Sequence, residues 1–323
     1  GTKLRYQQTD GLTLRRNAFN FNAFRGEGGI VVRNVLKEDN EANFNNWRGW
    51  WSGYTGWAVA GSKSIHVRHE LVRDYRLIGN LAYGYWLDIN CQNNNFEGLL
   101  AAYNYGGGFY YEICDGPALL ERSILAYNGV GALVQGSDPV WVRSNLLVGN
   151  GQQIRLTHER DLGRPLPGVN RQDELFDTRT LPRKTAALGR VQFQGNLIVS
   201  DSADVQLVGV RFQNDMRHRR EHFLTHWLTS DQNTYAAPSG ADYFGVLDGR
   251  HPHGRTMLPQ RSAQSSLDQW RESTRQDSRS RLVTIDELNA TASVPTDERL
   301  AEQSAFLQRG LAPETMQDLR AFF

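Results

Sequence analysis

The sequence has few cysteines and few lysines, and it has no long apolar run. Two cysteines among 323 residues cannot build a disulfide scaffold. No stretch of 18 apolar residues is present, so the sequence predicts no membrane-spanning helix. The first ten residues lack the apolar segment of a secretory signal peptide. A net charge of +1 excludes a chain-wide field that would attract nucleic acid.

Asparagine, by contrast, is abundant and regularly spaced. The chain has 22 asparagines, 17 of them before residue 151. Six of these follow one another after 24, 34, 24, 24 and 22 residues: Asn22, Asn46, Asn80, Asn104, Asn128 and Asn150. Helical repeats are longer than this, and the leucine spacing of a leucine-rich repeat is missing. With 31 glycines, the pattern predicts an all-β chain, a parallel β-solenoid of 22–24 residues per coil.

The same register predicts how the chain is organised. We expect β-helix coils over residues 1–213, with long loop excursions at 47–63 and 151–190. The repeat fades from 214 to 323, where short helical patterns predict a partly helical coil and cap region that covers the exposed strand edge. Because only 21 residues precede the first of the spaced asparagines, we expect the chain to be the C-terminal part of a longer solenoid.

Two carboxylates fall in one column of the predicted coils. Asp88 and Glu112 each follow a spaced asparagine by eight residues, and Gly136 takes this place in the next coil. Strand alternation places Trp86 and Tyr110 on the same outer face as the acids. Adjacent strands hold such side chains about 5 Å apart, and carboxyls about 5–5.5 Å apart are typical of retaining glycosidases. Like charges this close also favour keeping one acid protonated.

Other residues are predicted to bind a sugar around this pair. The dense tryptophans of the first excursion form a sugar-binding wall, or else pack the excursion against the solenoid. Lys63, placed in the same loop, is expected to contact a sugar hydroxyl or Asp88. The predicted substrate-binding set is Arg48, Trp50, Trp51, Trp57, Lys63, Trp86 and Tyr110. No metal-site or cofactor motif stands out, so we expect neither a metal nor a cofactor.

Two further patterns are predicted to be structural. One column stacks two glutamates between arginines: Arg73, Glu97, Glu121 and Arg143. The second pattern concerns the two cysteines. Cys91 and Cys114 differ in strand parity, so we expect free thiols that face opposite sides.

Several runs resemble a known family. They include NNWRGWWSGYTGWAVAGSK, GYWLDINCQNNNFEGLLAAYNYGGGFYYEICDGP, SDQNTY and SLDQWRESTRQDSRS. Over roughly residues 12–285 the chain is similar to bacterial right-handed parallel β-helix proteins of carbohydrate degradation, such as β-helical β-xylosidases and α-L-fucosidases. The resemblance implies an extracellular or periplasmic location, Asp88 as nucleophile and Glu112 as acid/base. The chain departs from that family in showing no intervening β-sandwich domain.

Three functions are compatible with these features. The leading hypothesis is a retaining glycoside hydrolase that acts on an oligo- or polysaccharide through Asp88 and Glu112. An alternative is a polysaccharide lyase or epimerase on a uronic-acid glycan, in which Lys63 joins the two acids. A non-catalytic glycan-binding β-helix is the third. In each case the expected partner is a carbohydrate.

Overall fold

The computed structural model describes residues 9–53, 59–114, 116–158, 188–212, 218–239, 243–248 and 263–291. The chain divides into two units, Gly1–Val283 and Thr284–Phe323. In the second unit, α4 (Ile285–Thr291) begins after Thr284, whose hydroxyl accepts a hydrogen bond from the backbone N–H of Glu287. No helix among the described residues is long and apolar enough to cross a membrane.

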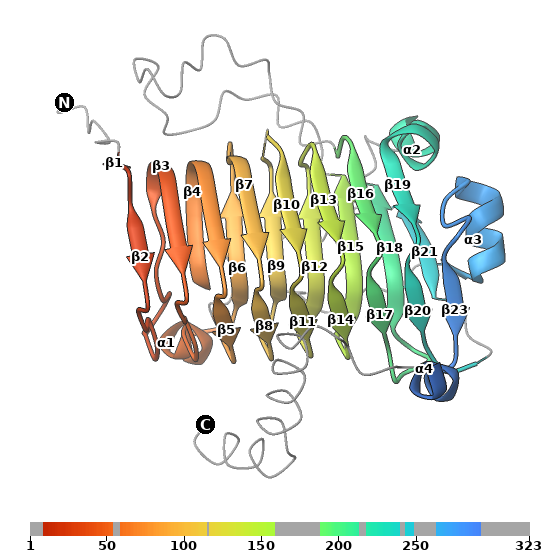
Figure 1. Cartoon of the computed structure of the whole chain (residues 1–323), viewed down its shortest axis with the longest axis horizontal. Helices are drawn as coiled ribbons and strands as arrows, with labels where there is room; N and C mark the ends of the chain where they lie inside the picture. The colour runs from red at the N-terminus through yellow and green to blue at the C-terminus, as the bar shows by residue number, and fades with distance from the viewer. Residues whose placement is uncertain are drawn as a thin grey trace. The chain divides into compact units, whose positions relative to one another are not determined.

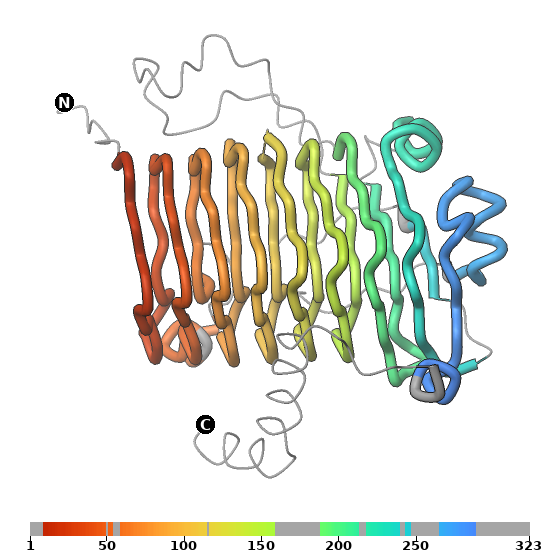
Figure 2. Tube along the Cα trace, viewed as in Figure 1, coloured from red at the N-terminus to blue at the C-terminus, as the bar shows by residue number. Residues whose placement is uncertain are grey.

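The first unit is a stack of coils, and a complete coil contains three parallel strands (Figure 1). Figure 2 follows the Cα trace of the same coils. The first face consists of β6 (Tyr83–Asp88), β9 (Gly107–Glu112), β12 (Val130–Gln135), β15 (Gln152–His158), β18 (Gln206–Phe212) and β21 (Phe244–Asp248). The second consists of β7 (Gln92–Glu97), β10 (Ala118–Glu121), β13 (Val140–Arg143), β16 (Val191–Gln194) and β19 (Leu228–Asp231). The third consists of β5 (Arg76–Ile78), β8 (Leu100–Ala102), β11 (Ile124–Ala126), β14 (Leu146–Val148), β17 (Leu197–Val199), β20 (Thr234–Ala236) and β23 (Arg281–Val283).

In the first coils, one long strand runs through both the first and the second face. β4 (Ala60–Arg73) is long enough to pair with both β6 and β7, and β3 (Ile30–Glu38) pairs with β4. The short strands β1 (Thr9–Asp10) and β2 (Thr13–Arg15) pair with β3. The predicted fold class, a right-handed parallel β-helix, is therefore confirmed.

The excursions are shorter than the sequence predicted. Lys63 lies inside β4 rather than in a loop, and the first excursion keeps only α1 (Trp47–Trp51) as regular structure among the described residues. Residues 152–158 form β15, and residues 159–187 lie outside the described ranges. Beyond residue 213, where the sequence repeat fades, β19, β20, β21 and β23 continue the parallel pairing.

Buried asparagine amides connect successive coils. Oδ1 of Asn104 accepts hydrogen bonds from the backbone N–H and the side-chain amide of Asn80, at 3.2 and 2.8 Å. Its own amide donates to Asn128 and to the carbonyl of Leu77. The full ladder is Asn22, Asn45, Asn80, Asn104, Asn128 and Asn150. The prediction of Asn46 is wrong by one residue, because Asn46 donates instead to the carbonyl of Leu81.

Inward side chains fill the lumen with aromatic and aliphatic groups. Tyr85, Leu87, Phe109 and Tyr111 are fully buried in the main core cluster, as strand alternation predicted. On the second face, Arg122 bridges Glu97 and Glu121 at 2.6 and 3.2 Å. Arg73 and Arg143 flank the two glutamates, which confirms the structural column.

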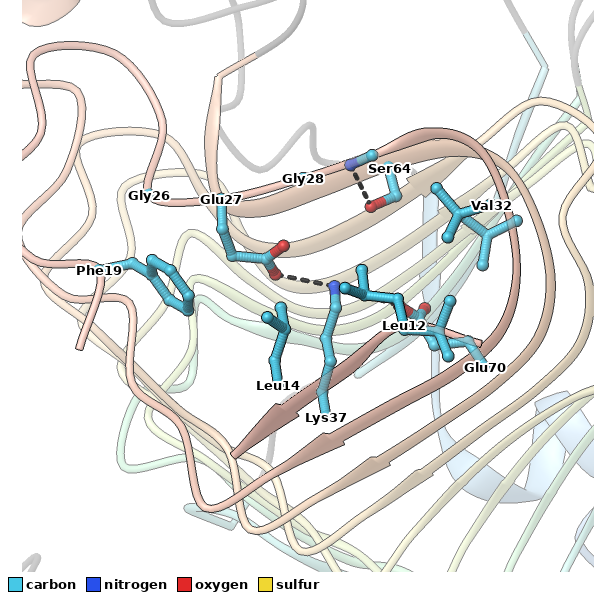
Figure 3. Close-up of a pocket in the computed structure, with 13 residues that line it drawn as sticks. Leu12, Leu14, Phe19, Gly26, Glu27, Gly28, Val32, Lys37, Ser64 and Glu70 are labelled. Atoms are coloured by element: carbon cyan, nitrogen blue, oxygen red, sulfur yellow. Dashed lines mark hydrogen bonds and ion pairs between the residues drawn. The ribbon is translucent and has the colours of Figure 1, made fainter. Parts of the chain in front are cut away.

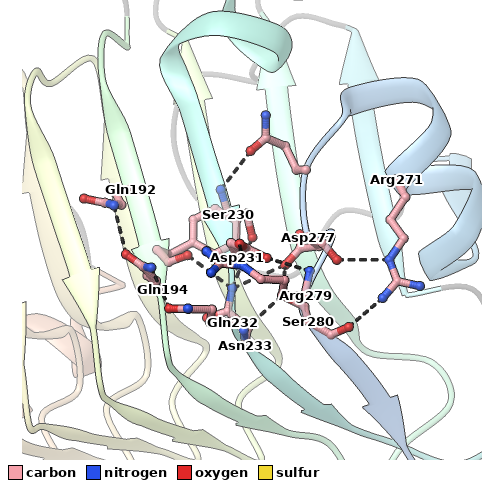
Figure 4. A network of polar contacts seen from close by, with 12 residues as sticks. Gln192, Gln194, Ser230, Asp231, Gln232, Asn233, Arg271, Asp277, Arg279 and Ser280 are labelled. Carbon is pink, nitrogen blue, oxygen red and sulfur yellow. Dashed lines mark hydrogen bonds and ion pairs between the residues drawn. The ribbon is translucent and has the colours of Figure 1, made fainter.

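A polar network closes the C-terminal end of the stack (Figure 4). Helix α3 (Leu267–Thr274) begins with a capping box between Ser266 and Gln269. Its Trp270 stacks on Phe244 of β21, and the indole N–H donates to Asp277 at 2.9 Å. The strand edge is further covered by β22 (Ala263–Ser265), which pairs antiparallel with β21. Two short helical turns, α2 (Arg220–His222) and the π-helical Phe223–Trp227, precede β19.

We predict that Asn104→Ala destabilises the first unit by about 3 kcal/mol. The substitution takes the Oδ1 acceptor away from two buried N–H groups of Asn80 and removes the amide that donates to the carbonyl of Leu77. Urea unfolding followed by tryptophan fluorescence measures this loss. The exposed Asn95 of β7 is the matched control, and Asn95→Ala should change stability by less than about 0.5 kcal/mol. Equal effects of the two variants would contradict a special role for the ladder.

Candidate active site

The two predicted acids lie side by side on the first face. Asp88 of β6 pairs with Glu112 of β9, and Trp86 pairs with Tyr110 in the same two strands. Trp86 and Tyr110 stack at 5.1 Å in a cluster separate from the main core, which places them on the outward side. Tyr83 packs against both rings. The predicted shared outer face is therefore present.

These outward residues are buried rather than open. Trp86 and Tyr110 are each 5% exposed and Asp88 is 4% exposed, whereas Glu112 is partly exposed. Burial raises the pKa of Tyr110, and the negative charge of Glu112 adds to this effect. The acid pair thus lies in a low-dielectric setting, where charge interactions are stronger than in water.

Lys63 forms an ion pair with one of the two acids. It lies in β4 directly beside Trp86, and its Nζ is 2.7 Å from Oδ2 of Asp88. The same ammonium lies 2.9 Å from the centroid of the Trp86 ring, a cation–π contact. Burial lowers the pKa of Lys63, while the opposite charge of Asp88 acts against this change. Of the two predicted partners of Lys63, the structure shows the carboxylate.

Glu112 receives hydrogen bonds from two neutral groups. The indole N–H of Trp86 donates to Oε2 at 3.0 Å, and the side-chain amide of Gln135 donates to Oε1 at 3.1 Å. Gln135 was missed because counting eight residues from Asn128 reaches Gly136. The pairing of Gly107 with Val130 shows that the turn after Asn128 is one residue shorter, so Gln135 pairs with Glu112.

Polar side chains continue along the same face toward the C-terminal coils. Arg155 follows Tyr110 in its column, two strands further on, and Arg211 follows Gln135 in the same way. Burial, together with the nearby charge of Arg211, lowers the pKa of Arg155 to about 10. The asparagine spacing reaches Arg155, which follows Asn150 by five residues as its partner Leu133 follows Asn128. It does not reach Arg211, because the regular spacing ends at Asn150.

The predicted tryptophan wall is only partly described. Trp51 is 74% exposed, and the backbone of Arg48 bonds to the carbonyl of Ala23 in the first coil. No described contact joins either residue to the acid pair. Trp57 and the side chain of Trp50 lie outside the described residues. Sugar binding by these residues stays a prediction.

Both cysteines are free thiols, as predicted, but their placement differs from the prediction. Cys91 and Cys114 are both buried in the main core cluster instead of facing opposite sides. Left-handed backbone at Ile89, Asn90 and Ile113 ends the strand alternation before it reaches the sulfurs. Parity counted along the strand therefore does not apply in these turns.

A second charged cluster lies in the lumen of the first coils (Figure 3). Lys37 is 2% exposed, and its Nζ is 2.8 Å from Glu27 and 3.1 Å from Glu70. The two carboxylates raise the pKa of Lys37 despite its burial. Glu27, Lys37 and Glu70 border a cavity of about 210 Å³ that is otherwise lined mainly by aliphatic side chains. Among the described residues, no group of three or more His, Cys, Asp or Glu is placed to hold a metal ion.

We predict that Asp88→Asn costs about 3 kcal/mol of stability, because it leaves the buried ammonium of Lys63 without its counter-charge. The double variant Lys63→Met/Asp88→Asn should lose at least about 1 kcal/mol less than the summed losses of Lys63→Met and Asp88→Asn measured separately. Urea unfolding at neutral pH measures both. Arg73→Met, at an exposed ion pair, is the control and should cost less than about 1 kcal/mol.

No family model matches the chain, and no curated protein matches it. Two solved structures from Azotobacter vinelandii are similar to it. The A-module of mannuronan C-5 epimerase AlgE4 has 15% identity and a TM-score of 0.49, and covers 80% of this chain and 58% of its own. The A-module of mannuronan C-5 epimerase AlgE6 has 16% identity and a TM-score of 0.49, with 76% and 60% covered. The chain thus spans about six tenths of the length of these structures.

Proposed function

We propose that this protein is a carbohydrate-active enzyme that hydrolyses a glycosidic bond with retention of configuration at Asp88 and Glu112. The observation that carries the proposal is their direct pairing on adjacent parallel strands. Strands are about 4.8 Å apart, which suits the short carboxyl separation of a retaining enzyme. An inverting enzyme needs room for a water molecule between its acids.

In the first step, an oxygen of Asp88 attacks the anomeric carbon, and the bond to the leaving oxygen breaks as Glu112 donates its proton to that oxygen. In the second step, the Glu112 carboxylate takes a proton from water. The resulting hydroxide oxygen displaces Asp88 and releases the sugar. Lys63 supports this assignment, because its ammonium lies 2.7 Å from the Asp88 carboxylate and orients it.

Access to the acid pair is uneven. Glu112 is partly exposed, whereas Asp88 and Trp86 are almost fully buried. A sugar therefore approaches from the side of Glu112, and attack by Asp88 requires its surroundings to open. The rings of Trp86 and Tyr110 then provide the apolar surface that packs against a sugar.

We predict that Asp88→Asn and Glu112→Gln each lower kcat by at least about 100-fold. Turnover is measured on a panel of alkyl and 4-nitrophenyl glycosides of neutral pentoses and hexoses. Glu112→Gln should lose less activity on the 4-nitrophenyl substrates, whose leaving group needs little protonation, than on the alkyl substrates. Early-time proton NMR should show the product anomer with retained configuration.

The matched control is Glu121→Gln, which removes a stacked carboxylate from the second face. This variant should keep wild-type turnover. Full activity of either Asp88→Asn or Glu112→Gln would refute the assignment, and an inverted product would refute the mechanism.

A second candidate is a lyase or epimerase that acts on a uronic-acid glycan, and the burial of Lys63 favours it. A lysine whose pKa is lowered is a better base near neutral pH, and it could remove the proton beside the sugar carboxylate. Arg155 and Arg211, on the same face, carry the charge type that binds carboxylates. Unsaturated products or changed epimer ratios from polygalacturonate or polymannuronate would support this candidate over hydrolysis.

A further inference from the structure

The lumen of the first coils contains a pocket that the acid pair does not use (Figure 3). The residues at its mouth are partly exposed side chains: Leu12, Leu14 and Phe19. At its floor, Lys37 and Glu70 are each 2% exposed. A ligand that enters beside β2 therefore meets an apolar wall first and buried charged groups at the bottom.

Two carboxylates meet a single ammonium at this floor. Lys37 donates hydrogen bonds to Glu27, Tyr85 and Ser62 at 2.8, 2.9 and 3.2 Å. An ammonium has three donors, so these bonds use all of them. Glu70 is left with a charge contact to Lys37 at 3.1 Å, and no hydrogen bond of normal geometry to either of its carboxylate oxygens is present among the described residues.

We propose that this pocket binds a small primary ammonium compound with an apolar body, whose ammonium contacts Glu70 and whose body packs against the aliphatic wall. The site is separate from the acid pair. Ser62 and Ser64 lie on the inner side of β4, at the pocket, whereas Lys63 lies on the outer side, at Asp88. The proposal is therefore independent of the proposed hydrolase function.

Charge balance favours a cation over an anion or a neutral ligand. Glu27, Glu70 and Lys37 together carry a formal charge of one negative unit in a buried space, where charges are poorly screened. Burial raises the pKa of Glu70, while the charge of Lys37 acts against this change. A ligand with one positive charge brings the cluster to neutrality and favours the ionised form of Glu70.

The chemistry of the lining favours an ammonium over a metal ion. Three ammonium hydrogens suit the oxygens of Glu70 and the hydroxyl of Ser64, which accepts one bond from the Gly29 N–H at 3.0 Å and has a second lone pair. The aliphatic wall cannot replace the water shell of a metal ion. In the part of the chain that the structure describes, no group of three or more His, Cys, Asp or Glu is placed to hold one.

The size of the pocket sets the size of the ligand. Its volume is about 210 Å³, and a cavity of about 150 Å³ is sufficient for benzene. The pocket therefore has room for one ring with a short aminomethyl arm, which is the size of benzylammonium. Phe19 at the mouth provides an aromatic ring for such a body to pack against.

Isothermal titration calorimetry with benzylammonium at neutral pH tests the proposal, and benzyl alcohol is the neutral probe of the same shape. The wild type should bind benzylammonium at least about 10-fold more tightly than benzyl alcohol. Glu70→Gln should weaken benzylammonium binding by at least about 10-fold, because it removes the counter-charge. The matched control is Glu38→Gln, which removes an exposed carboxylate of β3 and should leave the affinity unchanged.

A second pair of variants tests the location. Leu14→Trp fills the mouth of the pocket and should weaken both probes, whereas Thr13→Trp adds the same side chain to an exposed position of the same strand and should weaken neither. Circular dichroism confirms that each variant is folded. Because Leu14 is partly exposed, its replacement leaves the buried charges in place.

Three results would overturn the proposal. The first is no heat from benzylammonium at about 10 mM, a concentration that detects even weak binding. The second is equal affinity for benzylammonium and benzyl alcohol, which would show that Glu70 is neutral. The third is unchanged benzylammonium affinity in Glu70→Gln or Leu14→Trp, which would place the binding elsewhere. Glycoside turnover is measured separately, so its absence would contradict the hydrolase function and leave the pocket proposal intact.

Discussion

The structure depends on the hydrogen bonds that a buried asparagine makes to the coils on either side of it. One oxygen accepts from both the backbone and the side-chain N–H of the preceding asparagine, and the amide donates onward. Each asparagine thereby satisfies polar groups in a turn where water does not reach them. Because the bonds repeat from coil to coil, they align the turns, and the length of each turn then sets which residues pair on the strand that follows.

This register brings the two candidate catalytic acids together. Asp88 and Glu112 are 24 positions apart in the sequence, and they are neighbours only because their strands pair one coil apart. The same pairing aligns Lys63 with Trp86 and Gln135 with Glu112. A shift of one residue would turn each of these side chains to the other face of its sheet. The stability of the turns and the geometry of the acid pair are therefore linked.

The sequence predicted the parts of the fold that repeat. Asparagine spacing was sufficient for the solenoid, the coil length and the in-register acids, because each of these properties recurs in successive coils. The prediction failed where the repeat is irregular. Asn45 replaces Asn46 because the first coil is one residue shorter, and Gln135 replaces Gly136 because the turn after Asn128 is shorter. The cysteines were misplaced because left-handed turn residues end strand alternation.

By itself, the sequence determined that coils of this length form and that two acids share a column. The spacing of the asparagines specifies the coil length, and the equal distance of each acid from its asparagine specifies the column. Only the tertiary structure decided what surrounds the acids. It placed Lys63 in a strand against Asp88, buried the outward aromatic rings, and aligned Arg155 and Arg211 along the same face. The physical reason is that burial and charge pairing depend on segments that meet across coils, and a side chain's own sequence neighbours do not specify them.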